Sequence, residues 1–396
     1  MMNKGISKEI SNWISMQRDA MQALLRDLVN IDSGSYDKEG VDAVGRRIRD
    51  FLAEFDIETK VHAYPDFGDV ITAYTGGIRE NANSKFYMLM GHRDTVFPKG
   101  EAAKRPFTID NGRAYGPGVA DMKGGLVINA FVLAAFNRFA PQIPMAALFT
   151  SDEEIGSGVS RKHIEEEARK AIAVFNSEPG RANGNIVIAR KGGMTYNLRV
   201  EGKAAHSGVN FTDGASAITE IAGKIVALSR LTDLEQGVTV NVGLVQGGQS
   251  TNTVAPSAEC GIDVRFITND QRDYLIDAIR QIAENTTVAG TSAQLTLKSE
   301  FLPMVQTAEN QALADVYLSS ATEAGLKIDG EFTGGCADSG FTSSLGIPTL
   351  CGLGPVGGKA HTADEYIELN TLYERAQVLA DTICKLHGRT DNSNAG

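Results

Sequence analysis

Apolar runs of strand length alternate with stretches of helical periodicity in the first half of the chain and again near its end. Buried strands are predicted at 86–91, 143–150, 171–176 and 347–354, and a shorter alternating strand near 58–63. Helices are predicted at 6–30, 41–55 and 121–139, the last opened by Asp121. Apolar strands that alternate with helices indicate a mainly parallel sheet with helices on both faces.

The middle of the chain follows a different order. Strand patterns occur at 195–203, 238–248, 258–266 and 293–300, and helical patterns at 214–231 and 269–285. This β-α-β-β-α-β order is typical of the ferredoxin-like split unit. We therefore predict an α/β protein in which 1–192 and 302–396 form a three-layer main domain, and 193–301 form an inserted α+β domain.

Composition agrees with two domains and excludes several classes of partner. A chain of 396 residues is too long for one ordinary core. Its net charge of −11 argues against nucleic acid or an anionic membrane as a partner. We find neither a secretory signal nor a run of eighteen apolar residues that would span a membrane. Four widely spaced cysteines without a CxxC pair predict a cytoplasmic location with reduced thiols.

Acidic residues and histidines follow the predicted strands of the main domain. They are His92 and Asp94, Glu153 and Glu154, Glu178, and His361, with Asp121 at the start of a helix. In open α/β sheets ligands bind at the carboxyl ends of the strands. Two histidines and three carboxylates suit a pair of zinc-type ions. Asp121 suits the bridge, His92 and Glu178 one metal, and Glu154 and His361 the other.

Two neighbouring carboxylates are open to other interpretations. If the chain stays extended after His92, Asp94 points to the same face and can hold the imidazole, although it could also simply cap a turn. Of the adjacent Glu153 and Glu154, one can bind metal while the other serves as general base. With Asp152 these residues form an acidic triplet, which is usually a solvated turn. Its place directly after a buried strand favours a functional role instead.

The inserted domain offers weaker candidates. His206 and Asn252 could donate to an oxyanion, although a lone histidine near a strand end is more often structural. Arg265 could clamp a substrate carboxylate or form a surface ion pair. Farther along, Gly335 before Cys336 would let the backbone approach a ligand closely.

Six segments in order carry a resemblance to a known family: GHRDTV, RAYGPGVADMKGG, SDEEIGS, SEPG, GKAAHSG and HTADEY. The chain resembles the dinuclear-zinc exopeptidases and deacylases that include carboxypeptidase G, acetylornithine deacetylase and succinyl-diaminopimelate desuccinylase, and it is nearest to the carboxypeptidase G type. The resemblance implies that the main domain is catalytic and that the inserted domain is a lid and dimer interface.

The resemblance also implies roles for the matching positions. The implied metal ligands are His92, Asp121 as the bridge, Glu154, Glu178 and His361. Asp94 would orient a ligand and Glu153 would be the general base. His206 would reach the partner's active site in a homodimer, and Asn252 and Arg265 match positions near the substrate.

One position departs from the carboxypeptidase G pattern. That type has an arginine before the proline that follows the lid, where it reads the substrate's terminal carboxylate, and here Leu302 precedes Pro303. Leucine cannot make a bidentate pair, so glutamate specificity is not predicted. Arg190, Lys191 or Arg265 could supply the charge instead.

We therefore expect a hydrolase with two Zn²⁺ ions, for which Co²⁺ or Mn²⁺ could substitute, that cleaves the amide bond of a small peptide or N-acyl amino acid with a free carboxylate. Peptidase and N-acyl-amino-acid deacylase remain alternatives within this interpretation. A different class, an inactive binding or scaffold protein that kept the fold, is disfavoured because no ligand or base position is missing.

Overall fold

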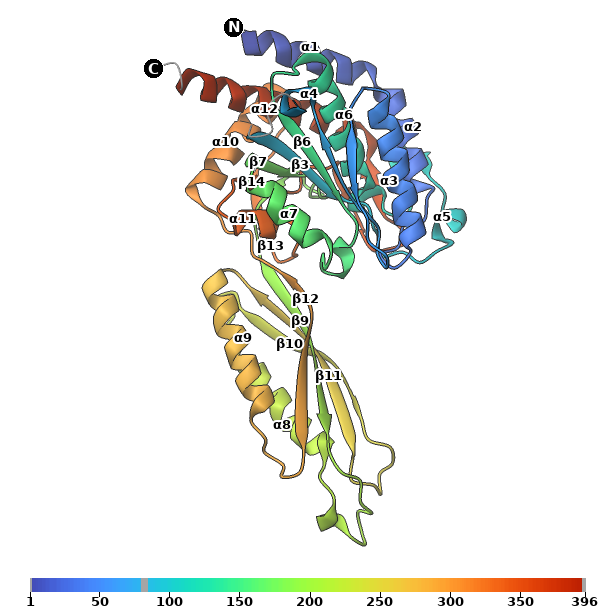
Figure 1. Cartoon of the computed structure of the whole chain (residues 1–396), viewed down its shortest axis with the longest axis vertical. Helices are drawn as coiled ribbons and strands as arrows, with labels where there is room; N and C mark the ends of the chain where they lie inside the picture. The colour runs from blue at the N-terminus through green and yellow to red at the C-terminus, as the bar shows by residue number, and fades with distance from the viewer. Residues whose placement is uncertain (1, 80–84, 394–396) are drawn as a thin grey trace. The chain divides into compact units, whose positions relative to one another are not determined.

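A computed structural model describes residues 2–79 and 85–393, which divide into two compact units (Figure 1). The large unit comprises 1–189, 306–332 and 341–396, and the insert unit comprises 190–305 and 333–340. The predicted insert, 193–301, thus lies inside the second unit. Segment 333–340 was expected in the main domain, but it belongs to the insert unit because Arg190 and Arg265 bond to Cys336 within it.

The large unit is built on a six-stranded sheet in the order β1-β2-β6-β3-β7-β14. The strands are β1 (Thr59–His62), β2 (Val70–Tyr74), β6 (Met145–Thr150), β3 (Phe86–His92), β7 (Ala171–Asn176) and β14 (Thr349–Leu350). β3 pairs in parallel with both β6 and β7, and β7 pairs in parallel with β14. The antiparallel pairs are β1 with β2 and β2 with β6, so only β2 runs against the other strands and the predicted mainly parallel sheet is confirmed.

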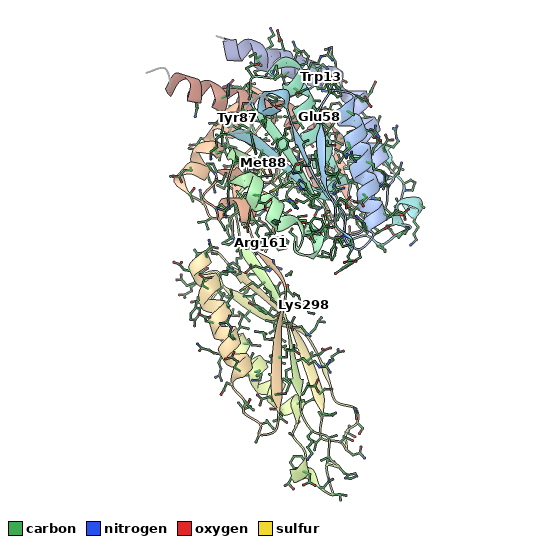
Figure 2. All side chains as sticks on the ribbon, in the orientation of Figure 1. Trp13, Glu58, Tyr87, Met88, Arg161 and Lys298 are labelled. Atoms are coloured by element: carbon green, nitrogen blue, oxygen red, sulfur yellow. The ribbon has the colours of Figure 1, made fainter. Side chains whose placement is uncertain are left out.

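Both faces of this sheet are covered, as the continuous apolar runs predict. On β3, Tyr87 joins the main hydrophobic core while its neighbour Met88, equally buried, lies outside that cluster because successive side chains point to opposite faces (Figure 2). The core face packs against α6 (Gly124–Phe139), which α1 (Met2–Met16), α2 (Arg18–Val29), α3 (Lys38–Ala53) and α12 (Leu369–Ser393) surround. α7 (Ser160–Ala168) packs against β6 and β7.

The helix at the centre of this core is apolar along most of its length. The stretch Val119–Phe139 is long and apolar enough to cross a membrane, but 94% of it is buried inside the unit. A helix that is apolar on all sides is expected at such a position in a large core. The described residues contain no other helix of this kind.

Three predicted boundaries were wrong for local reasons. The helix expected over 6–30 is broken at Gln17, whose backbone (φ −94°, ψ 10°) separates α1 from α2. The strand expected over 347–354 is cut to two residues, because Cys351 turns away to pair with Val187 and Gly352 adopts a positive φ. The helix expected to open at Asp121 begins at Gly124.

Several shorter elements complete the large unit. A small sheet in the order β15-β16-β5-β4 is formed by β15 (Gly357–Gly358), β16 (Tyr366–Glu368), β5 (Arg113–Tyr115) and β4 (Thr108–Asp110). The remaining elements are α4 (Gly76–Arg79), α5 (Glu101–Lys104), α10 (Ala308–Glu323), α11 (Ser339–Ser343), and the paired β8 (Ile186–Arg190) and β13 (Gly330–Thr333). The small sheet matters for the site because it joins the chain before Asp121 to the chain after His361.

The insert unit confirms the β-α-β-β-α-β order. Its antiparallel sheet runs β10 (Thr239–Gly247), β11 (Ser257–Phe266), β9 (Gly192–Glu201), β12 (Ser292–Phe301), and it carries α8 (Ala217–Ser229) and α9 (Asn269–Glu284). Alternate residues of β9, such as Leu198 and Val200, enter a separate hydrophobic core with both helices. Thr268 caps α9 in a reciprocal pair with Gln271.

Candidate metal centre

The five predicted ligands converge in the large unit, and each is held by the end of a strand or a turn. His92 is the last residue of β3, and Glu178 follows β7 by two residues. Glu154 lies in the short turn after β6. Asp121 lies in the irregular turn before α6, and His361 in the loop between β15 and β16. Parallel strands bring their carboxyl ends to one edge, so the topology explains the convergence.

Asp121 lies between the two histidines. Its Oδ1 is 3.1 Å from Nε2 of His92, and its Oδ2 is 3.3 Å from Nε2 of His361. Each carboxylate oxygen therefore faces a different imidazole. This is the geometry a carboxylate needs to bridge two ions.

The other two carboxylates divide between the histidines in the predicted way. Oε1 of Glu178 is 3.8 Å from Nε2 of His92, and Oε2 of Glu154 is 3.3 Å from Nε2 of His361. Atoms offered by His92, Asp121 and Glu154 all lie within 4.8 Å of one another. Two sets of nitrogen and oxygen donors thus share Asp121.

Carboxylates around the two histidines raise the pKa of both imidazoles. Hydrogen bonds to Asp121 and Glu154 raise the pKa of His361 to about 10. The burial of His92 lowers its pKa, but hydrogen bonds with Asp121 and Asp94 outweigh this and raise the pKa well above its usual value. The neighbouring carboxylates thus favour positive charge at both imidazoles, and a cation bound there would meet the same carboxylates.

Glu154 provides a direct test of whether this cluster fits a metal. Its Oε1 is buried and has no hydrogen-bond partner among the described residues. Burial, and then repulsion by Asp121, raise the pKa of Glu154 although His361 opposes this. A buried carboxylate oxygen without a partner is costly unless a cation binds it. The donor set therefore fits zinc-type ions.

Asp94 is more than an orienting partner for His92. The imidazole Nδ1–H donates to the backbone carbonyl of Asp94 at 3.0 Å, and the carboxylate lies farther away at 3.4 Å. The carboxylate instead accepts the backbone N–H groups of Glu153 and Glu154, each at 3.1 Å, and the hydroxyl of Ser35 at 2.7 Å. Burial opposes the ionisation of Asp94, but hydrogen bonds led by that with His92 lower its pKa.

The predicted base, Glu153, lies beside the ligand cluster. Its side chain is largely buried, and its backbone is fixed by Asp94. Because Glu154 is the next residue and is fixed by the same carboxylate, the two glutamates are held in one rigid turn. This arrangement leaves one carboxylate for the ligand cluster and one for a second role.

Glu365 is a residue that the sequence reasoning missed. It is fully buried, and its carboxylate accepts three backbone N–H groups of the Asp121 turn: Gly118 at 2.9 Å, Ala120 at 2.8 Å and Asp121 at 2.9 Å. These bonds keep Asp121 out of helical geometry, which explains why α6 starts later than predicted. Burial raises the pKa of Glu365 to about 7 against these hydrogen bonds. The only feature of the sequence that points to Glu365 is its position, four residues after His361 and just before β16.

The candidates of the insert unit form two separate groups. His206 and Asn252 are neighbours, since the backbone N–H of Ser207 donates to the carbonyl of Asn252 at 3.0 Å, and both are exposed. Arg265 lies beside Cys336, next to Gly335, and forms a double ion pair with Asp263. The ion-pair interpretation of Arg265 is therefore seen in the structure. A Cβ at Gly335 would meet only the hydroxyl of Thr333, at an ordinary contact distance of 4.0 Å, so sterics do not require glycine there.

The other basic candidates in the insert unit are also engaged. Arg190 donates to the carbonyl of Cys336 at 2.8 Å, and Lys191 donates to the carbonyl of Gly237 at 2.6 Å. With Arg265 paired to Asp263, each of the three cations has partners within its own unit. None of the three is therefore free to act as the arginine that the carboxypeptidase G type has at the position of Leu302.

Comparison with known proteins agrees with this site. The model of the family described as "Peptidase family M20/M25/M40" matches residues 88–385. Carboxypeptidase G2 of Pseudomonas sp. (strain RS-16) is 28% identical over 379 residues, which cover 93% of this chain and 90% of that protein.

Solved structures show the same fold. An M20 family metallo-carboxypeptidase from Sulfolobus solfataricus superimposes with a TM-score of 0.74 at 19% identity, covering 92% of this chain and 98% of that one. The Bacillus subtilis YXEP protein, described as a dinuclear metal-binding peptidase from the M20 family, gives a TM-score of 0.65 at 16% identity, with 94% and 99% coverage.

Proposed function

Because the chain belongs to the peptidase family M20/M25/M40, we propose that it uses two zinc ions to cleave the amide bond of a small peptide or N-acyl amino acid that carries a free carboxylate. Family membership makes the protein a metal-dependent hydrolase that acts on peptide bonds. The identity and number of the metal ions, the substrate within this class and the roles of single residues are our proposal.

The placement of Asp121 between His92 and His361 carries the two-metal proposal. His92 and Glu178 would hold one ion, Glu154 and His361 the other, and Asp121 both. Imidazole and carboxylate donors favour zinc, and Co²⁺ or Mn²⁺ accept the same ligand types. When bound, such ions polarise the scissile carbonyl and activate the attacking water.

The side chains around the metal ligands transfer the protons and hold the reacting groups in position. Glu153 takes a proton from water and returns it to the leaving amine, a task for a carboxylate held beside the reacting groups. Asp94 fixes the backbone of both Glu153 and Glu154, so base and ligand keep a constant spacing. The exposed imidazole of His206 is available to donate to the oxyanion.

The contacts of the basic residues bear on how the substrate carboxylate is recognised. Leu302 cannot bind a carboxylate, and Arg190, Lys191 and Arg265 all have partners within the insert unit. We therefore propose broad recognition of N-acyl amino acids or small peptides without strict preference for glutamate. This supports N-acyl-amino-acid deacylase as the second candidate function.

We also propose a homodimer formed through the insert unit. β10 is an outer strand of its sheet, and Leu244 and Val245 on it are 76% and 63% exposed. An exposed apolar edge strand is a template for pairing with another strand. In such a dimer His206 would serve the partner's site. A cytoplasmic location is proposed because the four cysteines are widely spaced in the sequence and form no CxxC pair.

Replacement of Glu153 by alanine tests the proposed mechanism. We expect kcat to fall by roughly 10²–10⁴-fold, because that is the usual contribution of a general base. Metal content, measured by plasma mass spectrometry, should equal that of the wild type because Glu154 and the other ligands are intact. Glu166→Ala, an exposed carboxylate on α7, is the matched control and should retain full activity. Substantial activity in Glu153→Ala would remove Glu153 as the base.

A further inference from the structure

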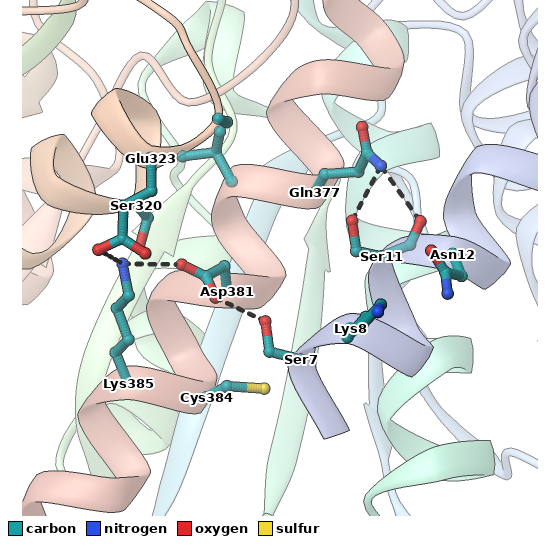
Figure 3. A pocket seen from close by; sticks show the side chains of 12 residues that line it. Ser7, Lys8, Ser11, Asn12, Ser320, Glu323, Gln377, Asp381, Cys384 and Lys385 are labelled. Carbon is teal, nitrogen blue, oxygen red and sulfur yellow. Dashed lines mark hydrogen bonds and ion pairs between the residues drawn. The ribbon is translucent and has the colours of Figure 1, made fainter. Parts of the chain in front are cut away.

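Two pockets of ligand size lie in the large unit, and their chemistry differs. The larger, of about 640 Å³, is formed by α1, α10 and α12 (Figure 3). Its charges satisfy one another, since Lys385 pairs with Glu323 at 2.8 Å and with Asp381 at 3.0 Å. The smaller, of about 520 Å³, lies beside the metal centre, because Glu154 forms part of its wall. We call it the Glu154 pocket.

The Glu154 pocket is built by two loops that are bonded together. One is the loop 33–37 after α2, and the other is the loop 95–99 after β3. The backbone N–H of Thr95 donates to the carbonyl of Ser33 at 2.8 Å, and that of Ser35 donates to Thr95 at 3.3 Å. The loops approach so closely that a Cβ on Gly34 would lie 2.6 Å from the carbonyl oxygen of Phe97. The pocket walls are therefore formed before any ligand binds.

The lining of this pocket is mainly apolar. Tyr36, Val96, Phe97, Pro98 and Ile155 supply most of the wall. Tyr36 is 80% exposed and Val96 43% exposed, so both side chains are accessible to a ligand. Asp37 and Lys99 pair with each other at 3.6 Å. The volume lies within the range of small-molecule sites, so the pocket suits a neutral apolar group of aliphatic or aromatic kind.

The position of the two glutamates indicates which side of the substrate enters. The scissile carbonyl must lie at the metal centre, and the leaving amine must lie within reach of the base, Glu153. Glu154 and Ile155 line the pocket, whereas Glu153 is not among its lining residues. The pocket therefore adjoins the ligand Glu154 more closely than the base Glu153.

We propose that the Glu154 pocket binds the apolar acyl group of an N-acyl amino acid, or the apolar side chain that precedes the scissile bond of a peptide. This inference rests on the proposed hydrolase function and adds to it the class of the acyl group. It makes Val96 and Tyr36 determinants of specificity, and neither is a ligand or a base.

Substitution Val96→Trp, which fills the pocket, tests the inference. The zinc-loaded variant is compared with the wild type on N-acetyl, N-butyryl, N-octanoyl and N-benzoyl forms of one amino acid. We expect kcat/KM for the octanoyl and benzoyl substrates to fall by about ten-fold or more, with the acetyl substrate nearly unchanged, since loss of apolar contacts gives discrimination of this size. Val96→Ala should relax the preference in the opposite direction, towards bulkier acyl groups.

Two controls separate a pocket effect from a general one. Val61→Trp places the same side chain on β1, outside the pocket, and should leave the acyl series unchanged. A second series varies the leaving amino acid under a constant acyl group, and Val96→Trp should not alter its order. An equal loss on all acyl groups, or a change of preference confined to the leaving amino acid, would overturn the inference.

The inference and the proposed function fail in different ways. If no substrate of any series is hydrolysed in a zinc-dependent manner by the wild type, the proposed function fails. In that case, calorimetric titration of zinc-loaded protein with N-benzoyl amino acid still decides the inference. Binding by the wild type that Val96→Trp weakens by about ten-fold would support the pocket, and equal binding, or no binding, would refute it.

Discussion

Carboxylates of the metal centre act in two ways at the scale of single residues. Asp121, Glu154 and Glu178 face the histidines, whereas Asp94 and Glu365 hold backbone N–H groups. The first kind could be predicted, because Glu154 and Glu178 follow strands, Asp121 precedes a helix, and each appears in a motif. The segment HTADEY includes Glu365, but its role could not be predicted, because a carboxylate that bonds to backbone leaves no spacing pattern between side chains. Asp94 lies beside His92 as predicted, but its backbone carbonyl is closer to the imidazole than its carboxylate, and the bonds of that carboxylate to Glu153 and Glu154 depend on loop geometry that a sequence does not show.

Substitution Glu365→Gln should weaken metal binding. The amide can accept hydrogen bonds with one oxygen only, and its NH₂ would face donors of the Asp121 turn. Loss of a residue that orients a ligand typically costs roughly 10–100-fold in metal affinity, and we expect that range for zinc. Competition with a chelator measures the affinity, and the d–d spectrum of the Co²⁺-loaded protein reports the coordination.

Glu368→Gln provides the matched control, because Glu368 lies three residues on and forms a surface ion pair with Arg113. It should leave zinc affinity and the cobalt spectrum unchanged. If Glu365→Gln binds zinc as tightly as Glu368→Gln and gives the same spectrum, Glu365 does not position Asp121.

Zinc binding should release protons at neutral pH. Hydrogen bonds to Asp121 and Glu154 raise the pKa of His361 to about 10 in the metal-free protein. This folded-state pKa lies above the unfolded value of about 6.5, so protonation of His361 stabilises the metal-free fold below about pH 6.5, and that contribution is lost as the pH rises through the folded pKa. Zinc requires neutral imidazole, so its apparent affinity should increase with pH between these values.

Calorimetric titration in buffers of different ionisation enthalpy measures this release. We expect the observed enthalpy to depend on the buffer at neutral pH, with net release of protons. An enthalpy independent of the buffer would show that His361 is neutral before zinc binds, contrary to the account.

At the scale of elements, the sequence predicted the helices and strands that have a strong hydrophobic periodicity. It missed the ends that tertiary contacts determine. The insert strands and helices fell within a few residues of their observed ends, because alternation and caps such as Thr268 mark them locally. The ends at Asp121 and Leu350 were wrong because bonds to distant segments decide them, whereas the break at Gln17 is a local change of backbone angles. Glu365 is 244 residues from Asp121 along the chain, and Val187 is 164 residues from Cys351.

The edge strand β10 allows a test of the proposed homodimer. Leu244→Lys should disrupt pairing along this edge, since a lysine on an edge strand opposes association. We expect dissociation of the dimer to become easier by roughly ten-fold or more, as for loss of a central apolar contact. Light scattering coupled to size-exclusion chromatography measures the mass over a range of concentrations.

Leu297→Lys on β12, the opposite edge of the same sheet, serves as control because Leu297 is also exposed. It should leave the dimer intact. A monomeric wild type, or equal effects of the two substitutions, would contradict an interface at β10.

At the scale of the whole molecule, the two-unit organisation could be predicted because the rhythm of the pattern changes near residue 192 and again near 302. The place of segment 333–340 in the insert unit could not be predicted. Cys336 in this segment bonds to Arg190 and Arg265, and the sequence pattern does not show such contacts. The large unit supplies the whole ligand cluster, and the insert unit supplies His206 and the paired cations. Substrate class is therefore the property that the sequence defined least.

Titration of the metal-free protein with zinc tests the two-metal account most directly. Bound zinc is measured by plasma mass spectrometry while hydrolysis of a panel of N-acyl amino acids and dipeptides is followed. The account predicts that activity rises until two zinc ions are bound per chain, stays constant beyond that point, and is lost with a chelator. Binding of well under one zinc ion per chain, or full occupancy without hydrolysis of any substrate in the panel, would contradict it.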